Sequence, residues 1–135
     1  MNSTPEAKVK AQKTRPLSPH LLIYKPQLTS GLSIFHRITG VGLSFGFIIF
    51  VWWLAALARG PETYIFFTSC ADSIVGQIIL FGMTAAFFYH LCCGIRHLLW
   101  DAGWFLELKD VYKTGYLVLA ATFILTALVW LKVWL

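Results

Sequence analysis

The stretch ITGVGLSFGFIIFVWWLAALA, residues 38–58, contains 21 residues without one formally charged side chain. At about 1.5 Å per residue, a helix of this length covers roughly 30 Å, the thickness of the hydrocarbon core of a bilayer. Two further apolar runs, 74–95 and 116–135, have nearly the same length. The chain is 58% hydrophobic and 13% charged, which is too apolar for a soluble domain of 135 residues. The sequence therefore predicts an all-α integral membrane protein with three transmembrane helices, at about residues 30–58, 74–100 and 114–135.

Basic residues lie mainly before the first predicted span, which indicates the direction of insertion. Six precede residue 38, whereas the connection at 59–73 has Arg59 against Glu62 and Asp72. The six are Lys8, Lys10, Lys13, Arg15, Lys25 and Arg37. Positively charged loops stay in the cytoplasm, so we expect a cytoplasmic N-terminus and a periplasmic C-terminus. The net charge of +5 thus follows membrane topology, and no partner nucleic acid is expected.

The polar N-terminal segment separates from the rest of the chain by composition. Residues 1–14 form a predicted flexible leader, and 15–135 form one three-helix membrane anchor. The leader lacks the short apolar core of a cleavable signal and the Ser/Arg-rich composition of a transit peptide. We therefore expect a multi-pass protein of the bacterial inner membrane, with the mitochondrial inner membrane as the less favoured location.

Three cysteines, Cys70, Cys92 and Cys93, carry little functional signal. The adjacent pair lies in an apolar run, where small, buried and inert thiols are expected. The sequence has no C-x-x-C-H motif, which excludes covalent c-type haem, and it has neither a dinucleotide fingerprint nor a P-loop.

The stretch YHLCCGIRHLLWD, residues 89–101, places an imidazole inside the second predicted span. His90 lies roughly 7–8 Å within the end of the charge-free run, an expensive position for a polar ring. His97 follows on the same helical stripe, and Gly94 leaves space there for a flat group. A haem with its iron at His90 and its propionates toward His97 fits this layout, while an interhelical hydrogen bond is the alternative for His90. A six-coordinate haem would need its second axial ligand from another chain, because the other histidines lie at or outside the boundary.

The stretch SIFHRITG, residues 33–40, brings costly polar groups to the start of the first apolar run. Ser33, His36 and Arg37 fall on neighbouring parts of one helical face, where they could hold one ligand. Two plainer alternatives are a helix cap for Ser33 and a local pair between His97 and Asp101. Since span one begins and span two ends on the cytoplasmic side, both polar stretches lie at one membrane surface and can form a composite site.

Two longer segments, RPLSPHLLIYKPQLTSGLSIFHRITG (15–40) and HLCCGIRHLLWDAG (90–103), resemble the cytochrome b membrane anchor of succinate dehydrogenase, respiratory complex II. The resemblance covers about residues 15–135. It implies that His90 ligates the iron of haem b, with His36 and His97 near the propionates. It also implies that Ser33, Ile34 and Arg37 line the ubiquinone pocket.

The same resemblance implies the partners of the chain. A second membrane-anchor subunit would complete the haem-binding bundle, of which this chain forms half. An iron–sulfur subunit and a flavoprotein subunit would sit on the cytoplasmic side, and SPHLLIY (18–24) would run along the membrane surface toward the iron–sulfur protein. Such a complex passes electrons from succinate to quinone in the tricarboxylic acid cycle and the respiratory chain, and the anchor is not catalytic alone.

The implied chemistry explains why the polar side chains of Ser33 and Arg37 stand at the start of the first apolar run. Ubiquinone gains negative charge on reduction, so Ser33 can donate a hydrogen bond to a quinone oxygen while Arg37 supplies positive potential. Electrons would come from a partner's iron–sulfur clusters, since the chain has no flavin motif and no suitable set of cysteines. Two alternatives remain: a quinone-reactive anchor of a fumarate reductase-type complex, which need not keep His90, and a purely structural anchor.

Overall fold

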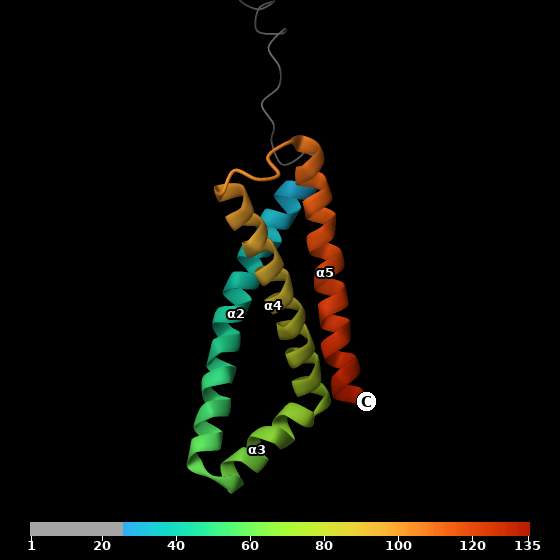
Figure 1. The fold of residues 1–135 in the computed structure, drawn as a ribbon. Coiled ribbons are helices and arrows are strands. Elements are labelled where there is room, and N and C mark those ends of the chain that lie inside the picture. The colour runs from blue at the N-terminus through green and yellow to red at the C-terminus, as the bar shows by residue number, and fades with distance from the viewer. Residues whose placement is uncertain (1–25) are drawn as a thin grey trace, which may run out of the picture.

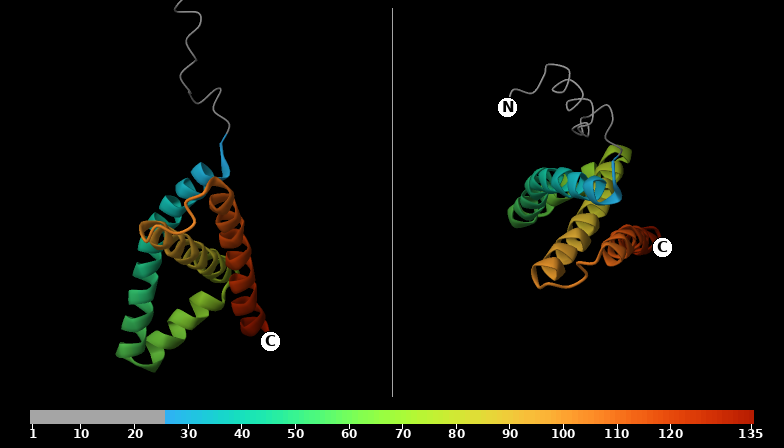
Figure 2. Two further views of the ribbon diagram at one scale, coloured as in Figure 1. Left: turned by 45° about the horizontal axis from the view of Figure 1, so that its top comes forward. Right: turned by 90° about the horizontal axis from the view of Figure 1, so that it is seen from above.

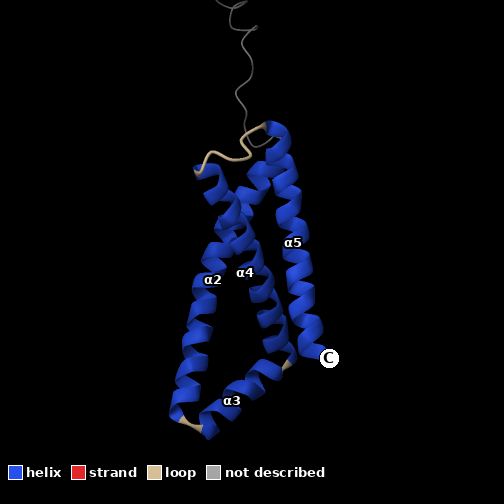
Figure 3. Ribbon diagram, in the orientation of Figure 1, coloured by secondary structure: helices blue, strands red, loops and turns tan. Residues whose placement is uncertain are grey.

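The computed structural model describes residues 26–135, which form four helices (Figure 1). Every regular element in this range is a helix (Figure 3). The helices are α2 (Leu28–Arg59), α3 (Pro61–Asp72), α4 (Ile74–Asp101) and α5 (Leu108–Trp134). Three of them, α2, α4 and α5, are long and apolar enough to cross a membrane, which confirms the predicted three-span fold. The predicted leader, 1–14, and the SPHLLIY segment lie outside the described residues.

Helix α3 is an addition to the predicted fold, in which its segment is a plain connection between spans one and two. Its start has a recognisable signal: Gly60 adopts a positive φ of 113°, Pro61 occupies the first turn and Glu62 follows it. Proline is tolerated there because the first amides of a helix have no partner within the helix, and an acidic side chain is favourable at the positive end of the helix dipole. The helix runs obliquely between the far ends of α2 and α4 (Figure 1).

Helices α2 and α5 begin earlier than their charge-free runs, whereas α4 begins at Ile74, as predicted. At the start of α2 the Gln27 amide donates to the Ser30 hydroxyl at 3.1 Å, and at the start of α4 the Gly76 amide donates to the Ser73 hydroxyl at 3.1 Å. Helix α5 begins at Leu108, six residues before the predicted 114. Its first two turns contain charged side chains, so the apolar run starts only after them. Charged side chains are nevertheless compatible with a helix at the membrane surface.

Helix α4 lies between α2 and α5 and contacts both of them (Figure 2). The three converge at the end that holds the start of α2, the end of α4 and the start of α5 (Figure 1). The buried cluster there consists of Leu32, Tyr89, Cys93 and Val118. Close approach is possible because Gly115 has no side chain: a Cβ at this position would lie 3.0 Å from Leu32 Cδ1. From this convergence α2 diverges from α4 toward α3.

The outward faces of the spans carry large apolar side chains, as a lipid-facing surface requires. Trp130, however, differs from the expectation that a tryptophan near a span end belongs to an interfacial aromatic belt. It is only 5% exposed and packs against Phe81, with the ring centroids 5.3 Å apart. Because α4 and α5 stay in contact along their length, Trp130 faces a neighbouring helix instead of the membrane interface.

Candidate functional site

Three imidazole rings, all predicted site residues, meet where α2 crosses α4. His36 comes from α2, whereas His90 and His97 come from α4. The rings of His36 and His90 are stacked, with centroids 4.0 Å apart and planes at 11° to each other. The His97 ring lies 5.3 Å from that of His36. The structure thus joins the two polar stretches of the sequence into one cluster.

A hydrogen bond across the helix pair fixes the proton of His90. Its Nδ1 lies 3.1 Å from the carbonyl oxygen of His36, and since a carbonyl only accepts, Nδ1 carries the hydrogen. The Thr39 hydroxyl, 3.3 Å from the same nitrogen, can also accept, because its own hydrogen points to a carbonyl of its helix. Nε2 then bears a lone pair and has no hydrogen-bond partner within the described residues. This is the tautomer that a metal-ligating histidine needs.

The surroundings of His90 are tight on one side and open on another. On α2, a Cβ at Gly40 would lie 3.0 Å from His90 Cε1, so the ring rests against bare backbone. On α4, a Cβ at Gly94 would meet nothing within 4 Å. The space predicted one turn from His90 is therefore present in the structure, and it can accept a flat group beside the helix.

His36 and His97 are the other two members of the imidazole cluster. Nδ1 of His36 is buried and has no hydrogen-bond partner within residues 26–135. His97 makes no ion pair with Asp101 there, so the local pair considered from sequence is not formed. Instead, its ring lies 5.3 Å from that of Trp100. A buried imidazole nitrogen without a partner is the kind of group that an acidic substituent of a ligand would satisfy.

The described residues contain no group of three or more histidine, cysteine or acidic side chains arranged to hold a metal ion. The three imidazoles stack or tilt against one another and do not point at a common centre. A bare ion is therefore a poor fit. A metal that brings its own equatorial ligands fits better, because it asks for only one axial nitrogen from this chain.

Ser33, Ile34 and Arg37 lie near the start of α2, at the same end as the histidines. Ser33 is not a helix cap, since α2 begins at Leu28 and the cap is Gln27. Its hydroxyl makes no hydrogen bond within the described part of the chain, and Arg37 is exposed without an ion pair there. Ile34 is 56% exposed. Together they offer a donor, a cation and an apolar surface to a molecule outside the chain.

Two side chains that sequence reasoning left aside hold this end of the molecule together. The Tyr89 hydroxyl donates to the Leu32 carbonyl at 2.8 Å and so ties α4 to α2. Arg96, only 5% exposed, ties α4 to α5: its Nε donates to Thr114 Oγ1 at 3.0 Å and its Nη2 to the Val111 carbonyl at 2.8 Å.

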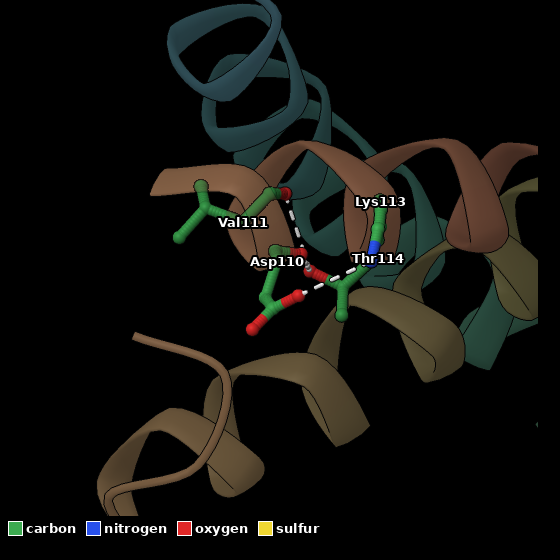
Figure 4. Close-up of polar contacts among 4 residues, drawn as sticks. All are labelled: Asp110, Val111, Lys113 and Thr114. Carbon is green, nitrogen blue, oxygen red and sulfur yellow. Dashed lines mark hydrogen bonds and ion pairs between the residues drawn. The ribbon is translucent and has the colours of Figure 1, made fainter. Parts of the chain in front are cut away.

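In the first turns of α5, a hydrogen bond within the helix fixes the position of the Thr114 hydroxyl that accepts from Arg96. Thr114 Oγ1 lies 2.9 Å from the Asp110 carbonyl, to which it donates, and Lys113 approaches the Asp110 carboxylate at 3.6 Å (Figure 4). The Arg96 guanidinium also stacks 3.9 Å from the centre of the Trp100 ring. The sequence contained one signal for the role of Arg96, because it is a charged side chain in a predicted span and lies next to a histidine. That position also fits a side chain that extends toward water, so the sequence did not distinguish the two roles.

The sequence of residues 11–129 matches the family model described as the succinate dehydrogenase/fumarate reductase transmembrane subunit. The chain belongs to this family. Curated relatives agree along most of its length: the succinate dehydrogenase cytochrome b556 subunit of Rickettsia felis is 47% identical, over 86% of this chain and 90% of its own. The cytochrome b560 subunit of Reclinomonas americana is 42% identical (87% and 85%), and the b556 subunit of Paracoccus denitrificans is 41% identical (84% and 88%).

Membership of the family agrees with the fold. The chain is a multi-pass membrane subunit of an oxidoreductase complex, and the predicted resemblance to succinate dehydrogenase is confirmed. The Rickettsia and Paracoccus relatives agree with the expected bacterial inner membrane. Cysteine takes no visible part in the site: Cys93 is buried, Cys70 and Cys92 are partly buried, and all three are free.

Proposed function

We propose that this chain is the haem-binding cytochrome b anchor of a succinate dehydrogenase and contributes to its ubiquinone reduction site. The observation that carries the proposal is the His90 imidazole, whose Nδ1–H donates to the His36 carbonyl so that Nε2 is free to bind a metal. A purely structural anchor would have no use for an imidazole held in this tautomer inside a span.

In this proposal His90 would hold the iron of haem b through Nε2, and His36 and His97 would lie near the propionates. The open space at Gly94 and the orphaned Nδ1 of His36 support this assignment. Bound haem would supply a one-electron redox centre near the quinone. Within the described residues His90 is the one histidine assigned to the iron, so a second nitrogen would come from the second membrane-anchor subunit, which would complete the bundle. The names of the relatives, cytochrome b556 and b560, agree with haem b.

The quinone site rests on the start of α2. Ser33 donates a hydrogen bond to a quinone oxygen, and Arg37 stabilises the negative charge that this oxygen gains on reduction. Ile34 contacts the apolar part of the ring. Both polar groups are free of partners within the described residues, so neither must break an existing bond to serve the quinone.

The remaining components follow from the position of this site. With the N-terminus in the cytoplasm, the site lies at the cytoplasmic surface, where protons for quinone reduction are available from water. A flavoprotein subunit oxidises succinate, and an iron–sulfur subunit carries the electrons to this end of the anchor. This chain therefore binds, orients and donates hydrogen bonds, and it performs no turnover alone.

Replacement of the proposed ligand tests the assignment. In the complex purified with its partners, His90→Leu should remove or convert the low-spin haem spectrum, because leucine has no lone pair for iron. His97→Gln, at the opposite end of the cluster, is the matched control and should keep the low-spin signature. If His90→Leu leaves the low-spin spectrum unchanged, His90 is not a ligand.

A quinone-reactive anchor of a fumarate reductase-type complex is the second candidate, because the family description covers both enzymes. The relatives named above are all succinate dehydrogenase subunits, which favours the first. Succinate oxidation and fumarate reduction rates of the purified complex separate the two.

A further inference from the structure

We propose that Thr39 and Gly40 are positioning residues of His90, which set the orientation of its imidazole and the electron density at Nε2. The inference rests on the proposed function, in which His90 ligates haem iron. It concerns two α2 residues that act through the His90 ring.

Gly40 fixes how closely the ring can approach α2. A Cβ on residue 40 would lie 3.0 Å from Cε1 of His90, 3.6 Å from Nδ1 and 4.0 Å from Nε2. Ordinary carbon–carbon contacts in packed interiors are about 3.5–4.0 Å, so even a methyl group must displace the imidazole. A shift of a few tenths of an ångström would relieve the contact, and it would move the imidazole relative to His36, on which it is stacked at 4.0 Å. Glycine at position 40 therefore permits this ring position without displacement.

Thr39 contacts Nδ1 of His90, the same nitrogen that donates to the His36 carbonyl. Its hydroxyl lies 3.3 Å from Nδ1 and 2.9 Å from the carbonyls of Phe35 and His36, to which its own hydrogen is directed. The lone pairs of Oγ1 and of the His36 carbonyl thus share the Nδ1–H of His90. Acceptors at Nδ1 push electron density toward Nε2 and make the ring a stronger ligand, which stabilises oxidised iron. Loss of one acceptor should raise the reduction potential of the haem.

The chain provides matched glycines for a test. Gly46 lies in the same α2–α4 interface, where a Cβ would collide with Met83 and with no histidine. Gly42 lies on α2 with nothing within 4 Å of its Cβ position. In the complete purified complex, Gly40→Ala should shift the low-spin electron paramagnetic resonance signal and the haem midpoint potential. Gly42→Ala should match the wild type, and Gly46→Ala, whose added methyl group meets only the flexible side chain of Met83, should leave the haem signal unchanged. Equal haem signals in Gly40→Ala and Gly42→Ala, or equal shifts in Gly40→Ala and Gly46→Ala, would overturn the role of Gly40.

Thr39→Val keeps the test informative if Gly40→Ala does not assemble, because valine retains the shape of threonine and removes the hydroxyl, both as acceptor for His90 Nδ1–H and as donor within α2. The haem potential of Thr39→Val should rise, while haem content and succinate oxidation with an artificial acceptor stay at the wild-type level. An unchanged potential contradicts the proposal. His90→Leu, measured in the same series, separates the two ideas: if it keeps the wild-type haem signal, the ligand assignment itself fails, whereas a normal Gly40→Ala beside an altered His90→Leu defeats only the positioning role.

Discussion

At the scale of single residues, the groups proposed to contact haem and quinone have unused hydrogen-bonding capacity within the described residues. Ser33 and Arg37 have no partner within the described residues, and His90 keeps Nε2 free although Nδ1 is bonded. Other polar side chains of the same helices, such as Thr84 and Ser44, return their hydroxyl hydrogens to a carbonyl of their own helix. This contrast supports the proposal that Ser33, Arg37 and His90 bind ligands.

Ser33→Ala should lower quinone reduction by about one to three orders of magnitude, because a hydrogen bond to a developing oxyanion is lost while the volume is nearly kept. Ser44→Ala, which removes a hydroxyl that bonds only to Gly40 of its own helix, should have little effect. The measurement is succinate:ubiquinone turnover of the purified complex, with haem content recorded alongside. Equal turnover in Ser33→Ala and Ser44→Ala would contradict the proposed quinone contact.

Arg37→Lys should also impair quinone turnover, although the positive charge is retained. Lysine offers a compact charge in place of the planar fork of donors, so the geometry of the hydrogen bonds is lost. Arg59→Lys, an exposed change at the opposite end of α2, is the control. Succinate oxidation with an artificial acceptor should remain normal in both variants. A normal ubiquinone rate in Arg37→Lys would show that charge alone suffices at this position.

At the scale of helices, polar links at one end decide the arrangement of the three spans. Lipid gives little hydrophobic drive for helix association, so close packing and interhelical hydrogen bonds matter more. Tyr89 links α4 to α2, and Arg96 links α4 to α5. Both links lie near the imidazole cluster, which suits a site that needs fixed distances between helices.

Thr114→Val should destabilise the α4–α5 contact by about 1–3 kcal/mol, because the buried Arg96 loses the acceptor of its Nε–H. Thr122→Val is matched in helix and in chemistry, since its hydroxyl donates only to the Val118 carbonyl, and it should cost little. Thermal unfolding of the assembled complex, followed in parallel for both variants, compares them. If the two midpoints coincide, the Arg96–Thr114 bond does not stabilise the anchor.

Much of this arrangement was predictable from sequence, for physical reasons that differ between elements. The three spans follow from the length of apolar runs, and the meeting of His36 with His90 follows from their placement at one surface. The short helix α3 was missed because its turn signals lie between hydropathy peaks. The hydrogen bonds of Tyr89 and Arg96 reach carbonyls of other helices, and side-chain patterns contain no information about which carbonyl lies opposite.

At the scale of the whole molecule, the predicted orientation in the membrane would place the proposed quinone site at the cytoplasmic surface, where water can supply protons. A reporter fused at the C-terminus should appear on the periplasmic side, because basic residues gather before the first span and α5 is the third crossing. A reporter inserted after Gly103, between α4 and α5, should appear in the cytoplasm. Reporters found on one and the same side would mean that one of the three helices does not cross the bilayer.

The divergence of α2 from α4 also has a mechanical consequence. Near its C-terminal end, α2 packs against α3 through Trp52 and Phe67, whose ring centroids are 4.8 Å apart. The helices are therefore linked directly at the histidine end, whereas at the other end α2 and α4 are connected through the short helix α3. Changes in bilayer thickness are accommodated by tilting of spans, at modest cost. Such strain should change the angle between α2 and α3 first, so that the distance from His90 to the proposed quinone contacts, Ser33 and Arg37, stays constant while the surrounding lipid changes.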